Sequence, residues 1–150
     1  MTDMTSMTRS TPWHLWAVGG ISLLWNSYGA YDYTRTNLPD GEAYMASLGM
    51  TAAQIATFHD MPTWAVAAWA FGVWGALAGS ILLLLRMKLA FQAFVVSLLG
   101  LLVSLVYAYG MTDAGAAGGT QGMIMYGVIL AACLFFVWYS RMASKSGILR

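Results

Sequence analysis

The sequence predicts an all-α membrane protein, a bundle of four transmembrane helices with its N and C termini in the cytoplasm. Three observations lead to this prediction. Of the 150 residues, 59% are hydrophobic and only 9% are charged, whereas a soluble domain carries about 25% charged residues. Four apolar segments have close to the roughly 20 residues that a membrane-spanning helix needs. Six of the seven Lys and Arg residues fall on one side of the resulting map.

The first predicted span covers residues 13–33 and follows a short N-terminal segment, residues 1–12, which we expect to be disordered and cytoplasmic. A cleavable signal peptide is the alternative interpretation of this region. Such a peptide needs a positively charged flank, but here Asp3 offsets Arg9. The polar Asn26 also interrupts what would be its apolar centre. We therefore expect the segment to remain as a span.

The transmembrane domain is predicted to cover residues 13–140, followed by a basic cytoplasmic tail at 141–150. Its other three spans are predicted at residues 62–85, 89–109 and 122–139. Only residues 86–88 separate the second span from the third, so these two helices must form an antiparallel hairpin.

The first outer loop is expected to contain structure of its own. The sequence Asn37-Leu38-Pro39-Asp40-Gly41 has turn chemistry. Residues 42–48 and 51–58 then predict two short helices, with Thr51 as the N-cap of the second. The second outer loop, residues 111–121, is rich in Gly and Ala, and we expect it to be mobile.

The distribution of basic residues predicts the orientation. Four crossings place both termini on the same side as the connection between the second and third spans. That side carries Arg9, Arg86, Lys88, Arg141, Lys145 and Arg150, and the opposite side carries only Arg35. Cytoplasmic loops of membrane proteins are enriched in Lys and Arg. Both termini are therefore expected to be cytoplasmic.

Small residues predict where the helices pack, because they allow helix backbones to approach closely within lipid. The second and third spans both carry such residues at helical spacing: Ala68, Gly72, Gly75, Ala76, Gly79, Ser80, Ser97, Gly100 and Ser104. We expect these residues to pack the two helices of the hairpin together. Homodimerisation through the same GxxxG pattern is the alternative.

A polar set in the first span gives the candidate site for a substrate. Asn26 and Ser27 lie well inside the span, where polar side chains need partners in the bundle. Asp32 lies near the outer boundary and can pair with Arg35 one turn later. A local ion pair at the water interface is one interpretation, and a shallow solute or cation site is the other.

The sequence contains no arrangement of residues that predicts catalysis, a metal or a cofactor. His59 and Asp60 come just before the second span, but no HxxxH or HExxH spacing accompanies them. Asp60 is more simply explained as an acid at a helix N-terminus. The net charge of +1 excludes a strongly basic surface for nucleic acid. We therefore expect neither an enzyme nor a nucleic-acid-binding protein.

Three motifs carry a resemblance to a known group of proteins. They are WNSYGAYDY at residues 25–33, PTW at 62–64 and GVWGALAGS at 72–80. The chain resembles a group of small, uncharacterised four-helix bacterial membrane proteins, some of which carry an automatic "sugar transporter" label. The likeness covers nearly all of the chain after its first dozen residues. It implies a bacterial inner membrane, but it brings no sugar-binding residues with it.

Two functions are consistent with these features. The first is a non-enzymatic membrane component, a structural or accessory bundle that associates with itself or with a larger membrane complex. The alternative is a small oligomeric transporter of a neutral solute such as a sugar, with its path between protomers. Asn26 and the scattered serines are the only polar groups at depth, and no acid lies at the centre to carry a proton. An intramembrane enzyme that uses His59 and the outer acids is a third and weaker hypothesis.

Overall fold

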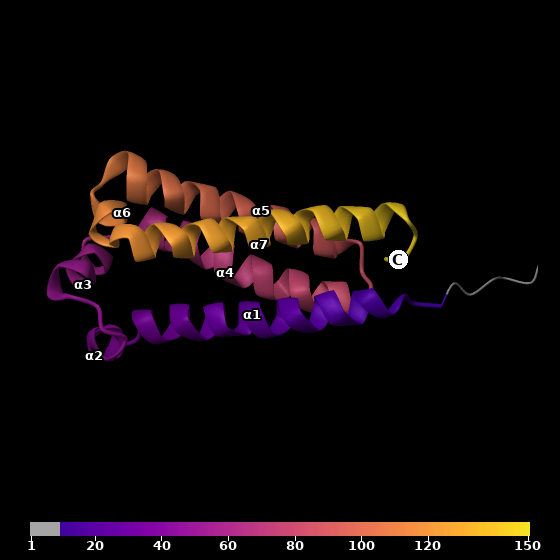
Figure 1. Ribbon diagram of the computed structural model, residues 1–150, viewed down its shortest axis with the longest axis horizontal. Helices are drawn as coiled ribbons and strands as arrows, with labels where there is room; N and C mark the ends of the chain where they lie inside the picture. The colour runs from indigo at the N-terminus through magenta and orange to yellow at the C-terminus, as the bar shows by residue number, and fades with distance from the viewer. Residues whose placement is uncertain (1–9) are drawn as a thin grey trace, which may run out of the picture.

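The computed structural model describes residues 10–150, and within that range the chain is helical with no β-strand (Figure 1). Four long helices run along the length of the molecule, and three short helices lie at one end of it. The predicted disordered segment at 1–12 lies almost entirely outside the described residues.

Helix α1 covers Trp13–Asn37, four residues beyond the predicted end of the first span. Polar side chains support this extra turn: the Thr34 hydroxyl donates to the Ala30 carbonyl at 2.7 Å, and the Asn37 amide donates to the Tyr33 carbonyl at 2.8 Å. The helix stops before Leu38, whose backbone is extended. Leu38 precedes a proline, and the residue before a proline avoids the helical conformation.

The first outer loop contains both of the short helices expected there. They are α2, Gly41–Ser47, and α3, Ala52–His59. A capping box begins α3, in which the Thr51 hydroxyl accepts from the Gln54 amide and the Gln54 side chain accepts from the Thr51 amide. The sequence did not predict α6, Ala114–Ala117, which lies in the Gly- and Ala-rich second outer loop.

Helices α4, Thr63–Leu84, and α5, Leu89–Leu105, form the predicted hairpin. The tight turn between them places Arg86 at a φ of 60°, a left-handed conformation that few residues other than glycine adopt. Helix α5 continues as a π-helical turn, η1, over Val106–Met111. The last helix, α7, covers Gly119–Lys145 and is longer at both ends than the predicted 122–139.

Glycines bring α4 and α5 into close contact. A Cβ added to Gly100 would lie 2.6 Å from both the Ala68 carbonyl oxygen and the Gly72 nitrogen. The Ser97 hydroxyl donates to the Gly72 carbonyl at 2.6 Å, so a hydrogen bond also joins the two helices. Backbone atoms cannot move aside as side chains can. The close approach therefore depends on the absence of a side chain at Gly100.

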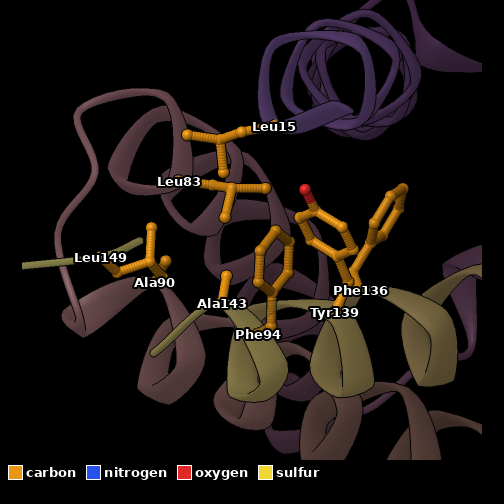
Figure 2. Packing of buried hydrophobic residues seen from close by; sticks show 8 residues of the cluster. All are labelled: Leu15, Leu83, Ala90, Phe94, Phe136, Tyr139, Ala143 and Leu149. Carbon is orange, nitrogen blue, oxygen red and sulfur yellow. The ribbon is translucent and has the colours of Figure 1, made fainter. Parts of the chain in front are cut away.

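The long helices meet in a core near one end of the bundle (Figure 2). Leu15 of α1, Leu83 of α4, Phe94 of α5 and Phe136 of α7 all contribute to it. The rings of Phe94 and Phe136 stack with their centroids 5.4 Å apart. The same cluster also contains Ala90, Tyr139, Ala143 and Leu149.

Within residues 10–150, three helices are long and apolar enough to cross a membrane by length and composition: Thr63–Leu84, Leu89–Met111 and Gly119–Lys145. Helix α1 is as long as these but does not meet the same criterion, because its second half contains several polar residues. The structure therefore supports a helical membrane protein with three candidate spans.

Candidate functional site

A hydrogen-bonded triad of polar side chains lies between α1 and α4. Ser22 and Asn26 stand one turn apart on the buried face of α1, and Ser80 faces them from α4. The Asn26 amide nitrogen donates to the hydroxyl oxygens of Ser80 at 2.9 Å and Ser22 at 3.2 Å. The two serine oxygens lie 2.6 Å apart. Ser22 and Ser80 are fully buried, and Asn26 is 9% exposed.

The hydrogen bonds of the triad form a chain that ends at a backbone carbonyl. The Ser80 hydroxyl lies 2.8 Å from the Ala76 carbonyl of its own helix and can donate to it. Ser22 then donates to the Ser80 oxygen, and both hydrogens of the Asn26 amide are used. Because every one of these donors has a partner, the triad holds α1 against α4 and presents no free hydrogen to a bound solute.

Ser27, which the sequence grouped with Asn26, lies on a different face of α1. It is exposed and is not part of the triad. Ser22 was not predicted as a partner of Asn26. The spacing of four residues between Ser22 and Asn26 was the available signal, because it places both side chains on one helical face.

At the other end of α1, the expected Asp32–Arg35 pair is not formed. Arg35 instead pairs with Asp40, with 2.9 Å between the guanidinium nitrogen and the carboxylate oxygen. Asp32 accepts a hydrogen bond from the Tyr44 hydroxyl at 2.8 Å. The Arg35 guanidinium also lies over the Tyr44 ring, 5.4 Å from its centroid. Tyr44, contributed by α2, therefore separates the acid and the base that sequence spacing would join.

This contact has an electrostatic consequence for Tyr44. Desolvation, together with the hydrogen bond to the Asp32 carboxylate and its negative charge, raises the pKa of Tyr44 to about 12. The hydroxyl stays protonated at neutral pH and remains a donor to Asp32. The contact thus fixes α2 against the end of α1.

A small cavity of about 230 Å³ lies beside these residues, between the end of α1, α2, α3 and the start of α4. Its lining is mixed, with polar groups from Thr36, Asn37 and His59 and the aromatic rings of Phe58 and Trp69. The other lining residues are Leu38, Met45, Met61 and Val66.

His59 and the acids near it do not form a metal centre in the part of the chain that the structure describes. The His59 imidazole pairs with the Glu42 carboxylate at 2.7 Å, which joins α3 to α2. Among residues 10–150, no three His, Cys, Asp or Glu side chains lie close enough together to hold a metal ion.

The small residues of α4 and α5 divide between two helix contacts. Gly72, Gly75, Ser97 and Gly100 lie where α4 meets α5, with Ala68 contributing its carbonyl oxygen there. Gly79 lies against the Phe94 ring. Ser80 belongs to the triad on the α1 side, and the carbonyl of buried Ala76 accepts its hydrogen bond. The Ser104 hydroxyl bonds to the Gly100 carbonyl of its own helix.

Comparison with known proteins adds no family to this description: no protein-family model, no curated protein and no solved structure matches the chain.

Proposed function

We propose that this chain is a four-span protein of the bacterial inner membrane that acts without catalysis, as an accessory helical bundle that associates with itself. The observation that carries this proposal is the exposed face of α1. Leu24, Ser27 and Tyr31 are exposed and follow one another at helical spacing, and half-buried Gly20 continues the row one turn earlier. We call these four residues the α1 outer face.

The polarity of the α1 outer face supports a protein neighbour. Ser27 is exposed inside the predicted span, where lipid tails offer no partner for its hydroxyl group. Tyr31, which is 55% exposed, continues the row toward the outer boundary. A Cβ added to Gly20 would meet no atom within 4 Å, so another helix can approach closely there. Exposed positions on the other long helices include large apolar side chains that are compatible with lipid, such as Phe71, Leu99 and Leu134.

The triad supports α1 as the fourth span. A polar residue inside the membrane needs a hydrogen-bond partner, and Ser80 of α4 supplies one to both Ser22 and Asn26. The basic residues at one end of the bundle favour an orientation with both termini in the cytoplasm. The sequence resemblance favours the bacterial inner membrane.

Blue-native electrophoresis and light scattering in mild detergent test self-association. We expect the wild-type chain to be an oligomer and the variant Gly20→Leu, which adds bulk to the α1 outer face, to be a monomer. The matched control is Gly127→Leu on α7, where a Cβ also meets nothing within 4 Å, and it should keep the wild-type mass. A monomeric wild-type chain that captures no partner in a mild-detergent pull-down would refute the proposal.

The cavity beside α2 and α3 favours one second candidate, a carrier of a small neutral solute. Its volume of about 230 Å³ and its lining of Thr36, Asn37 and Trp69 fit a compact polar molecule better than a drug-sized one. Uptake of labelled sugars into proteoliposomes tests this function, with protein-free liposomes as the control. Equal uptake in both would exclude it for the sugars used.

A further inference from the structure

Charge is segregated between the two ends of the bundle. Every carboxylate side chain among residues 10–150 belongs to the end that carries α2, α3 and α6: Asp32, Asp40, Glu42, Asp60 and Asp113. The opposite end carries Arg86, Lys88, Arg141, Lys145 and Arg150. Within the described residues, side-chain ion pairs occur only at the acidic end. Within residues 10–150, the five cations of the basic end therefore form no ion pair with a carboxylate side chain.

The end of the chain folds back against the α4–α5 turn and brings Arg150 to Arg86 and Lys88. After α7 ends at Lys145, Gly147 has a φ of 74° and reverses the chain. Leu149 is then only 1% exposed, inside the core cluster. This buried anchor fixes the last residues against the bundle instead of leaving them as a free tail.

Backbone hydrogen bonds set the position of the last residue. The Arg150 amide donates to the Arg86 carbonyl at 2.7 Å, and the Lys88 amide donates to the Arg150 carbonyl at 3.0 Å. The Arg86 guanidinium donates through Nε to the Ile148 carbonyl at 3.2 Å. Arg86, Lys88 and Arg150 thus lie together, although some 62 positions separate the α4–α5 turn from the end of the chain. Arg141 and Lys145 are exposed near the end of α7, at the same end of the bundle. We call Arg86, Lys88, Arg141, Lys145 and Arg150 the basic ledge.

Three exposed tryptophans lie at the same end of the bundle as the basic ledge. Trp13 and Trp16 at the start of α1 are 78% and 52% exposed, and Trp138 of α7 is 59% exposed, one turn before Arg141. Indole rings prefer the boundary between hydrocarbon and headgroups. Cations next to these rings, at the helix ends, lie at the level of the lipid phosphates.

We propose that the basic ledge binds the headgroups of anionic phospholipids. Clustered Lys and Arg side chains just outside membrane helices attract anionic lipid, and guanidinium groups can form paired hydrogen bonds with phosphate. The ledge meets both conditions, and no carboxylate side chain of the described residues pairs with it. This inference goes beyond self-association, because it requires only that the apolar helices lie in a bilayer.

Native mass spectrometry of the full chain in a neutral detergent tests the proposal. The protein is titrated with phosphatidylglycerol and, separately, with zwitterionic phosphatidylcholine of the same acyl chains. We expect phosphatidylglycerol to bind more tightly than phosphatidylcholine. We also expect the affinity for phosphatidylglycerol to fall as salt is added, because salt screens charges. Equal binding of the two lipids would overturn the proposal, whatever the oligomeric state of the protein.

Charge variants locate the binding. Lys88 and Lys145 are exposed, so their side chains can be replaced with little effect on folding. Each charge near an anionic surface contributes about a fivefold change in affinity, so Lys88→Gln with Lys145→Gln should weaken phosphatidylglycerol binding about 25-fold. The matched variant with both residues replaced by arginine should bind like the wild type. Equal losses in the two variants would show that charge is not the cause.

A competition experiment separates lipid from other sources of phosphate. Inorganic phosphate at millimolar concentration should not displace phosphatidylglycerol, because it lacks the acyl chains that lie along the exposed apolar helices. Displacement at that concentration would assign the ledge to a soluble phosphate ligand and overturn the lipid proposal.

A control variant tests the location of the site. Arg35→Gln removes a cation at the acidic end and should leave phosphatidylglycerol binding unchanged. A loss of binding in this variant would show that the ledge is not the binding site.

Discussion

Replacing Ser80 with alanine should weaken the contact between α1 and α4 and lower the free energy of unfolding, because Ser80 is the only member of the triad that α4 contributes. Its hydroxyl contacts Ser22 at 2.6 Å and Asn26 at 2.9 Å. Hydrogen bonds between membrane helices average about 0.6 kcal/mol and reach about 1.7 kcal/mol. Two such bonds give an expected loss of about 1.2 kcal/mol and an upper bound of about 3.4 kcal/mol.

Two structural details narrow the expected loss in the free energy of unfolding. Ser80 is fully buried, so water cannot replace the lost hydroxyl. Against this, Ser22 and Asn26 keep their own hydrogen bond at 3.2 Å, so neither residue loses every partner. We therefore expect a decrease of about 1 to 2 kcal/mol in the free energy of unfolding.

Unfolding in mixed micelles, followed by far-UV circular dichroism, measures this loss. Ser104→Ala is the matched control, because the Ser104 hydroxyl bonds only to the Gly100 carbonyl of its own helix. Both substitutions gain the same helix propensity, so the difference between them isolates the contact with α1. If Ser80→Ala is no more destabilising than Ser104→Ala, the triad does not hold the two helices together.

A double-mutant cycle gives a stricter test of the same contact. Asn26→Ala and Ser80→Ala should together cost about 0.6 kcal/mol less than the sum of the single substitutions, since either one removes their shared hydrogen bond. Strict additivity would refute the geometry described for the triad.

Three other substitutions have defined outcomes. Gly100→Ala should destabilise the protein by about 1 to 3 kcal/mol, because the added methyl group would meet backbone atoms of α4; Gly127→Ala, with open space around it, should have little effect in the same unfolding assay. Tyr44→Phe should remove one group with a midpoint near pH 12 from the ultraviolet titration of the tyrosines. The pKa of Tyr44 lies above the ordinary value of 10. The stabilisation from Tyr44 is therefore full below pH 10 and is lost as the pH rises through 12. Gly147→Ala should cost about 1 to 2 kcal/mol, because a side chain is strained at a φ of 74°, and faster hydrogen exchange at Leu149 should accompany the loss.

An unchanged unfolding curve for Gly100→Ala would mean that α4 and α5 are further apart than described. A tyrosine titration that is the same with and without Tyr44 would show that this hydroxyl is not held by Asp32. Wild-type exchange rates in Gly147→Ala would show that the fold-back of the last residues does not depend on the left-handed glycine.

The long helices could be predicted from sequence because an apolar run of sufficient length is a local property. Their bounds were less accurate, since hydrogen bonds from Thr34 and Asn37 extend α1 beyond its apolar part. The short helix α6 was missed because its Gly- and Ala-rich sequence is typical of a loop.

The partners of individual side chains depend on tertiary placement and could not be predicted in the same way. Spacing favoured a pair between Asp32 and Arg35, but the position of Tyr44 on α2 decides where each of them points. The fold-back of the chain end did leave a signal, since a glycine followed by Ile148 and Leu149 after a helix is typical of a C-terminal cap with a hydrophobic contact.

The triad has a consequence for how the protein is made. Ser80 follows Ser22 by 58 positions, and at about 5 to 20 residues per second a ribosome needs about 3 to 12 s to add that stretch. On the proposed topology, the first helix reaches the insertion machinery seconds before its hydrogen-bond partner on α4 exists. Until Ser80 is made, the triad is reduced to the hydrogen bond between Ser22 and Asn26, so we expect the first helix to enter lipid more favourably together with the second long helix than alone.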